Sequence, residues 1–233
     1  MLLPRLYAIL AADFFHDAKA MFLAAEELAA AGCMLIQYRN KGGNARVMLE
    51  QARELKGRMS GVGGRDPHVS QKTGDPSAGS GQAMGHPRDE KGIRLIMNDR
   101  ADLCLVVDFD GVHVGQDDLS PESVRKMIGP ERWLGVSTHN PEQVAEADET
   151  SADYLAIGPV FATSSKEKPD PVVGLEGVRR ARQLTRKPLV AIGGITRANA
   201  ASVIEAGANS VAVISDLLRE PGKSAEEFFR VLR

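Results

Sequence analysis

Short apolar runs alternate along the chain with stretches whose apolar residues recur at helical spacing. The runs cover residues 5–10, 33–38, 93–97, 110–114, 133–137, 153–158, 188–192 and 210–214. Strands that alternate with helices form a parallel sheet, and eight such units predict a single-domain (β/α)8 TIM barrel, a fold of typically ~250 residues. The alternative is a doubly wound open sheet, but no G-x-G-x-x-G follows the first strand and no P-loop motif is present.

The helical patterns between these runs have recognisable ends. They cover residues 17–31, 43–59, 100–107, 175–184, 196–206 and 225–232. Two further helices begin at capping residues: Ser120 before Pro121, and Asn140 with Gln143 three residues later. These ends place a helix after each predicted strand, as the barrel requires.

Residues 61–92 interrupt the pattern. They hold eight glycines and three prolines with little apolar periodicity, so we expect a long flexible insertion loop before the third strand. The segment joins a helix to the next strand. Such connections lie on the face opposite the carboxyl ends of the strands, so we expect it to stay away from the chemistry. The chain is then one barrel over residues 1–233 with an insertion at 61–92.

Acidic residues follow two consecutive strands in the stretch from Ile93 to Asp118. Asn98 and Asp99 end one strand, and Asp118 follows the next. The carboxyl ends of parallel strands share one face and neighbouring strands lie about 5 Å apart, so Asp99 and Asp118 can meet at one cation. The structural alternatives are that Asn98 or Asp99 caps the following helix and that Asp118 belongs to a turn.

Polar and small residues follow most of the other strands as well. The collected strand-end residues are Gln37, Arg39, Lys41, Asn98, Asp99, Asp118, Ser137, Thr163, Ser165, Lys166, Gly193, Gly194 and Ser215. Three cations and two acids at one mouth suit a diphosphate held with Mg²⁺, which takes one or two carboxylates plus phosphate oxygens. The small residues after the last two strands suit a single phosphate. A tight turn at the glycines and solvated surface lysines are the alternatives.

Composition narrows the class of protein. The chain has 233 residues and a formal net charge of −2, which argues against the basic face that nucleic-acid binding needs. No stretch approaches the roughly 18 apolar residues of a membrane span. The apolar start is interrupted by Arg5 and Asp13, so we interpret it as a strand and not as a signal peptide. Cys33 and Cys104 lie in apolar runs, which predicts reduced core residues in a cytoplasmic protein.

Seven stretches match a known family in order. They are IQYRNK (36–41), IMNDRADL (96–103), DGVHVGQDDL (110–119), GVSTHN (135–140), DYLAIGPVFATSSK (153–166), AIGGI (191–195) and AVIS (212–215). On these motifs the chain resembles the thiamine-phosphate synthase family over nearly its whole length, except 61–92. The resemblance implies a Mg²⁺-dependent transferase that acts on small-molecule substrates. It would join hydroxymethylpyrimidine diphosphate to hydroxyethylthiazole phosphate with loss of pyrophosphate, through a dissociative step.

The resemblance also implies roles for individual residues. Asp99 and Asp118 would bind Mg²⁺. The diphosphate would be held by Arg39, Lys41, Asn98 and Lys166. Gln37 and Ser137 would contact the pyrimidine, and the thiazole phosphate end would be lined by Thr163, Ser165, Gly193, Ile214 and Ser215. Arg39, Lys41, Lys166 and Ser137 are the residues expected to carry catalysis.

Two departures from the family pattern stand out. Ser165 occupies a position where the family often has threonine, and the 61–92 insertion is longer than usual. Two alternative functions stay open at this level: a thiazole tautomerase that uses His139 as acid and base, and a non-catalytic barrel that binds thiazole phosphate. The sequence allows a homo-oligomer without specifying one.

Overall fold

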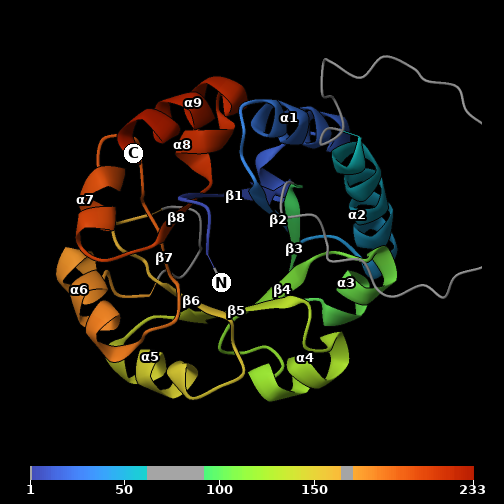
Figure 1. Ribbon diagram of the computed structural model, residues 1–233. Coiled ribbons are helices and arrows are strands. Elements are labelled where there is room, and N and C mark those ends of the chain that lie inside the picture. The colour runs from blue at the N-terminus through green and yellow to red at the C-terminus, as the bar shows by residue number, and fades with distance from the viewer. Residues whose placement is uncertain (1, 62–91, 164–169) are drawn as a thin grey trace, which may run out of the picture.

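The computed structural model describes residues 2–61, 92–163 and 170–233, and it confirms the predicted barrel. Within these residues, eight parallel strands close in sequential order, and β8 pairs with β1. The strands are β1 (Leu6–Ala11), β2 (Leu35–Arg39), β3 (Arg94–Asn98), β4 (Gly111–Val114), β5 (Trp133–Thr138), β6 (Tyr154–Ile157), β7 (Leu189–Ile192) and β8 (Ser210–Val213). Helices ring the barrel on its outside (Figure 1).

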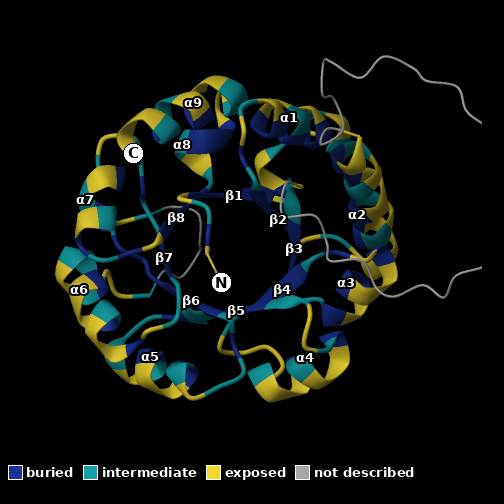
Figure 2. Ribbon diagram, viewed as in Figure 1, coloured by how far each residue is buried: buried dark blue, intermediate teal, exposed yellow. Residues whose placement is uncertain are grey.

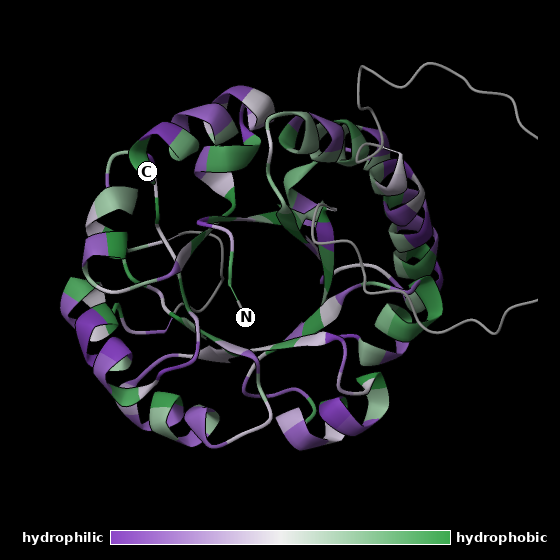
Figure 3. Cartoon of the chain, in the orientation of Figure 1, coloured by the Kyte–Doolittle hydropathy of each residue, from purple (hydrophilic) through white to green (hydrophobic). Residues whose placement is uncertain are grey.

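The helices follow the strands as the sequence predicts. They are the 3-10 helix η1 (Ala12–Phe14), and α1 (Ala18–Ala30), α2 (Ala45–Ser60), α3 (Ala101–Val107), α4 (Pro121–Ile128), α5 (Pro141–Asp148), α6 (Gly174–Leu184), α7 (Ala200–Glu205), α8 (Ser215–Leu218) and α9 (Pro221–Val231). Ser120 and Asn140 cap α4 and α5 through their side chains. The helices show hydrophobic and hydrophilic residues interleaved along their turns (Figure 3), as expected of helices packed on one side only.

The last third of the chain differs in detail from the prediction. α7 begins at Ala200 and not at Thr196; the residues before it form a turn in which the Thr196 amide donates to Asn199 Oδ1 at 2.8 Å. α9 begins at Pro221, four residues before its predicted start, with proline in the first helical turn. α8 was not predicted, because four residues are too short for a periodic signal.

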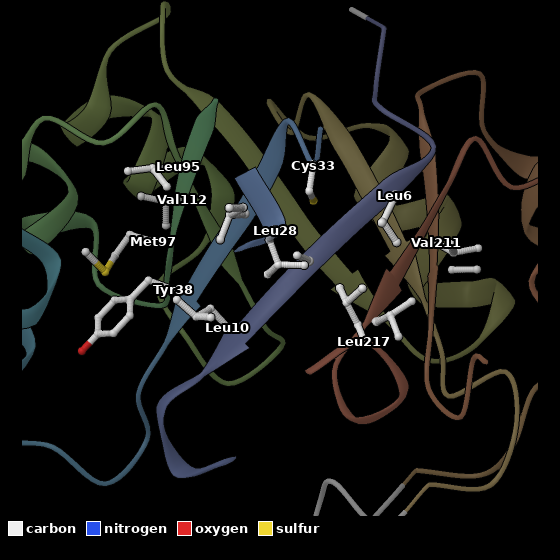
Figure 4. Packing of buried hydrophobic residues seen from close by; sticks show 14 of the residues in the cluster. Leu6, Leu10, Leu28, Cys33, Tyr38, Leu95, Met97, Val112, Val211 and Leu217 are labelled. Atoms are coloured by element: carbon white, nitrogen blue, oxygen red, sulfur yellow. The ribbon is translucent and has the colours of Figure 1, made fainter. Parts of the chain in front are cut away.

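Strand alternation divides the interior into two layers. In β1, Leu6, Ala8 and Leu10 belong to the cluster beneath the helices, whereas Tyr7 and Ile9 belong to the cluster inside the barrel. Figure 4 shows part of the first cluster, and the strands are mostly dark blue in Figure 2 because both of their faces are covered. Successive side chains point to opposite faces of a strand, so alternate residues of each strand point into the barrel.

The same alternation directs the site residues. Gln37 and Arg39 share the parity of Leu35, and Asn98 shares that of Ile96; Leu35 and Ile96 both lie in the inner cluster. These polar side chains therefore follow the apolar inner layer toward the carboxyl ends of their strands.

Part of the predicted insertion, residues 62–91, lies outside the described residues, and its expected flexibility stays a prediction. α2 ends at Ser60 and β3 begins at Arg94, so the segment does connect a helix to a strand. Within residues 2–61, 92–163 and 170–233, every helix is too short or too polar to cross a lipid bilayer.

Candidate active site

The turn after β3 holds Asp99 in an unusual backbone conformation. Asp99 has φ 60°, a left-handed conformation that Asp tolerates better than most residues. Its amide donates to the His113 carbonyl at 2.8 Å, which ties the turn to β4. The residue before α3 is Arg100, and no side chain caps this helix. The capping alternative for Asn98 and Asp99 is therefore wrong.

Asp99 lies beside Asp118, as the strand-end argument predicts. Burial, together with the charge of Asp118 and a hydrogen bond with it, raises the pKa of Asp99 to about 6. The charge of Lys41 and a hydrogen bond from Asn98 oppose the shift. Asp118 also accepts a 2.7 Å hydrogen bond from the Gly115 amide, so its role in a turn is correct as well. Four predicted residues from β2, β3 and β4 thus meet at one place.

The acidic pair fits a hard divalent cation. A buried carboxylate beside a second carboxylate gains from a cation between them. Among the described residues, no group of three or more His, Cys, Asp or Glu side chains could hold a metal. Two carboxylates with room for phosphate oxygens are the donor set expected of Mg²⁺ and not of zinc.

The predicted cations are placed unequally. The Arg39 side chain is 16% exposed, and its Nη1 lies 3.8 Å from Asp13 Oδ1 in η1, after β1. Lys41 is exposed, and its charge acts on Asp99. Lys166 and Ser165 lie outside the described residues, so their predicted places in the site stay predictions.

A chain of buried polar side chains crosses the barrel between Gln37 and Ser137. Gln37 Nε2 donates to Tyr7 Oη at 2.9 Å, and Tyr7 Oη lies 3.0 Å from Tyr154 Oη. Tyr154 Oη lies 3.1 Å from His113 Nδ1, and His113 Nε2 lies 2.8 Å from Ser137 Oγ. Burial lowers the pKa of His113 to about 4 and raises the pKa of both tyrosines.

Sequence reasoning missed Tyr7, His113 and Tyr154. All three lie within strands, where an aromatic residue is ordinary core material. The available signal was strand alternation, which places Tyr7 and Tyr154 in the inner cluster with Ile9 and Ala156 and turns His113 inward between two outward valines.

The ends of β6, β7 and β8 form the other half of the mouth. Gly193 and Gly194 have φ 97° and 62°. The Val160 and Phe161 amides donate to the carbonyls of Ile192 and Gly193 at 2.9 and 3.0 Å. A Cβ at Gly193 would lie 2.5 Å from Pro159 Cβ. The glycines are therefore needed for this close backbone approach, and Thr163 follows on the same segment after β6.

The remaining two predicted residues follow β8. Ile214 comes directly after the strand, and Ser215 is the first residue of α8. Ser215 is exposed and Ile214 is half-buried. Both stand at the carboxyl end of β8, as predicted.

His139 lies apart from the acidic pair. Its Nδ1 contacts the Gly158 carbonyl at 2.6 Å and lies 3.6 Å from Asp170 Oδ2. It lines a cavity of about 320 Å³ that also touches α6 and includes none of the predicted site residues. This position favours a structural His139 and weakens the tautomerase alternative.

Fold and site together define a class: a (β/α)8-barrel enzyme with a charged and glycine-rich mouth at the carboxyl ends of its strands. Comparison with known proteins narrows the class. The model of the thiamine monophosphate synthase family matches residues 79–217. The chain belongs to the thiamine-phosphate synthase family.

Individual relatives agree over nearly the whole chain. A thiamine-phosphate synthase of Koribacter versatilis is 52% identical over 99% of this chain and 96% of its own length. That of Shouchella clausii is 37% identical over 92% and 88%. Among solved structures, a thiamine phosphate pyrophosphorylase from Pyrococcus furiosus superposes with a TM-score of 0.76 at 28% identity, covering 98% of this chain and 95% of that one.

Proposed function

We propose that the chain joins 4-amino-5-hydroxymethyl-2-methylpyrimidine diphosphate to 4-methyl-5-(2-phosphoethyl)thiazole, forming thiamine monophosphate and pyrophosphate. The observation that carries the proposal is the pairing of Asp99 with Asp118 beside the charge of Lys41. A tautomerase or a thiazole-phosphate-binding barrel handles no diphosphate and has no use for this group. The names of the relatives support the same reaction.

Mg²⁺ is the cation that suits the acidic pair, and Asp99 and Asp118 would hold it. When bound, it supplies positive charge to the diphosphate leaving group. The chain's own cations would act on the same charge. Arg39 offers a fork of donors and Lys41 a point charge, with Asn98 as a neutral donor. Lys166 joins this set by resemblance alone.

The proposed step needs no strong base. The bond between the pyrimidine methylene carbon and the diphosphate oxygen breaks, and both electrons leave on the oxygen. The lone pair of the thiazole nitrogen then forms the new C–N bond. Negative charge grows on the diphosphate, so preorganised donors stabilise the transition state, each by typically ~3 kcal/mol.

The two substrates would lie at different parts of the mouth. Gln37 and Ser137 face the pyrimidine ring. Lining for the thiazole phosphate would come from Thr163, Ser165, Gly193, Ile214 and Ser215. The buried thiols of Cys33 and Cys104 support a cytoplasmic protein. That location and a homo-oligomeric state remain predictions.

A turnover assay tests the function. The purified full chain is mixed with both substrates and Mg²⁺, and thiamine monophosphate is measured after oxidation to thiochrome. We expect product that disappears with chelator and returns with added Mg²⁺. Calorimetric titration with thiazole phosphate in chelator runs in parallel. Tight binding without turnover under any condition would support the non-catalytic barrel and overturn the proposal.

A further inference from the structure

The hydrogen-bonded chain inside the barrel has a direction. Its five members come from five different strands. Four members are at most 8% exposed: Gln37, Tyr7, Tyr154 and His113. Ser137 stands at its far end, toward the mouth, and is half-buried. A buried donor without an acceptor costs about 1–3 kcal/mol, so each proton in the chain needs an acceptor.

Counting protons from Gln37 fixes each bond. The Gln37 Nε2 amide can only donate, so Tyr7 Oη accepts from it. Among the described residues, the acceptor left for the Tyr7 proton is Tyr154 Oη. The Tyr154 proton must then go to His113 Nδ1. A neutral imidazole with a bare Nδ1 carries its proton on Nε2, so His113 donates to Ser137 Oγ.

A doubly protonated His113 does not fit this count. Its Nδ1–H would donate to Tyr154, Tyr154 would donate to Tyr7, and the Tyr7 proton would face the donating amide of Gln37. One buried proton would then lack an acceptor. The neutral Nε2–H form is the arrangement that satisfies every member.

Gly135 makes room for this chain. A Cβ at Gly135 would lie 2.2 Å from Tyr154 Cζ and 2.4 Å from His113 Nδ1. Any side chain at this position would separate the two rings. The glycine in β5 therefore leaves room for the Tyr154–His113 hydrogen bond.

We propose that Tyr7, Tyr154 and His113 are positioning residues that fix the polarity of the pyrimidine site, leaving Ser137 as a hydrogen-bond donor and the Gln37 carbonyl oxygen as an acceptor. The assignment of the ligand rests on the proposed function. Ser137 accepts from His113, so its own proton is left for a ligand. Gln37 makes no second hydrogen bond within the described residues, so its Oε1 stays available.

This polarity matches one edge of an aminopyrimidine. The ring nitrogen accepts a hydrogen bond, and the neighbouring exocyclic amine donates one. A 4-oxo analogue presents the reverse pattern, with N–H as donor and carbonyl as acceptor. A site that is built to hydrogen-bond one pattern discriminates strongly against its inverse, because its polar groups are left unpaired. We therefore expect the enzyme to reject the 4-oxo diphosphate analogue.

The first test reads the proton directly and needs no substrate. The full chain, with its five histidines labelled with ¹⁵N, is studied by imidazole NMR at pH 7.5, and His113→Gln identifies the signal. We expect a protonated Nε2 and a bare Nδ1. The Nδ1–H form, or a doubly protonated ring, would overturn the proposal whether or not the enzyme turns over.

The second test uses Tyr154→Phe, which keeps the ring and breaks the chain between Tyr7 and His113. We expect the KM for the pyrimidine diphosphate to rise about tenfold, the worth of roughly one hydrogen bond, with little change in the KM for thiazole phosphate. Rejection of the 4-oxo analogue should weaken in the same variant. An equal rise in both KM values would indicate a merely structural role and contradict the proposal.

Tyr38→Phe is the matched control. Tyr38 is also a fully buried strand tyrosine, but its hydroxyl donates to Gln51 Oε1 at 2.6 Å, beneath the helices. Asn40 stays held by Gln51 and by the amides of Gly42 and Gly43. This variant should lose stability without a change in either KM.

A double substitution separates positioning from general damage. In Ser137→Ala one end of the chain is gone, so adding Tyr154→Phe should raise the pyrimidine KM by less than it does in the wild type, through Gln37 alone. Additive effects would contradict the proposal. Failure of the wild-type protein to turn over would instead refute the proposed function and leave the NMR result standing.

Discussion

The two halves of the barrel mouth use different parts of the chain. At the ends of β3 and β4 the chemistry lies on side chains, with Asp99 beside Asp118. At the end of β7 it lies in the backbone, where Gly193 and Gly194 adopt positive φ and contact the segment after β6. The first half is therefore sensitive to charge, and the second half is sensitive to added volume.

The halves also differ in how they are stabilised. The acidic pair is unfavourable in the free protein, because two carboxylates share one place. The turn after β7 is instead braced by Arg197, whose Nε and Nη2 each donate to Asp216 at 3.1 Å, while its backbone amide donates at 2.9 Å. Arg197 also pairs with Glu227 on α9. The unfavourable charge pair thus lies where a cation is expected. The Gly193–Gly194 turn is instead held in place by the side chain of Arg197.

The largest expected effect is on the charged half. Asp99→Asn keeps the size and the tolerance of positive φ but removes one carboxylate from the pair. We expect kcat/KM to fall on the order of 10³-fold, as when a major electrostatic group is lost, with the folded state intact. Steady-state thiochrome kinetics over a Mg²⁺ series measures this.

Asp117→Asn is the control for that variant. Asp117 is the exposed neighbour of Asp118, and its replacement changes the net charge equally. It should leave turnover within about twofold of wild type, since exposed charges are largely screened. Equal losses in both variants, or unchanged turnover in Asp99→Asn, would remove the acidic pair from the site.

The second prediction concerns the backbone half. In Gly193→Ala the new Cβ meets Pro159 Cβ at 2.5 Å and Cα at 2.6 Å, with φ at 97°. We expect a loss of about 2–4 kcal/mol in the free energy of unfolding. The KM for thiazole phosphate should rise on the order of tenfold, while the pyrimidine KM changes little. Denaturant titration and steady-state kinetics measure both.

Gly57→Ala provides the matched control. Gly57 lies within α2, where a Cβ would have nothing within 4 Å. The same substitution should there stabilise the protein by about 0.5–1 kcal/mol, because alanine favours the helix. A Gly193→Ala protein with wild-type stability and kinetics would show that the turn after β7 is not a tight cradle.

The third prediction concerns Arg197, whose side chain supports the turn after β7 without belonging to Gly193 or Gly194. Arg197→Ala removes the side-chain hydrogen bonds to Asp216 and Glu227, and we expect a loss of about 1–2 kcal/mol of stability with a roughly threefold rise in the thiazole phosphate KM. Arg180→Ala removes the exposed ion pair with Glu176 and should have almost no effect. If the two variants behave alike, the contacts of Arg197 with Asp216 and Glu227 do not support the site.

Much of the fold was predictable, because each strand is a compact apolar run followed by a helix with a clear start. The acidic pair was predictable too, since Asp99 and Asp118 follow consecutive parallel strands. The roles of Tyr7, His113 and Tyr154 were not, because buried aromatic residues look the same in sequence whether they pack or transmit hydrogen bonds. The contact between Arg197 and Asp216 was equally hidden, because the two residues lie 19 positions apart and follow different strands.

The smallest expected effect is on the free energy of unfolding. It should be seen in the half that holds Asp99 and Asp118, and not in the half after β7. The pKa of Asp99 is about 6 in the folded state, above its ordinary value of 3.8. Below pH 3.8 the carboxyl is protonated in both states and costs nothing. As pH rises from about 4 to 6 the unfolded state ionises first, so folding stability falls, and the full penalty remains above pH 6. With allowance for solvent screening of this partly exposed group, the penalty is about 1 kcal/mol.

Asp99→Asn should therefore be more stable than wild type at pH 8 in chelator by about that amount, and equal to it near pH 3.5. Added Mg²⁺ should stabilise wild type and leave Asp99→Asn nearly unchanged. Urea titrations at both pH values decide this, and an Asp99→Asn protein less stable than wild type at pH 8 would show that the two carboxylates do not repel each other in the folded state.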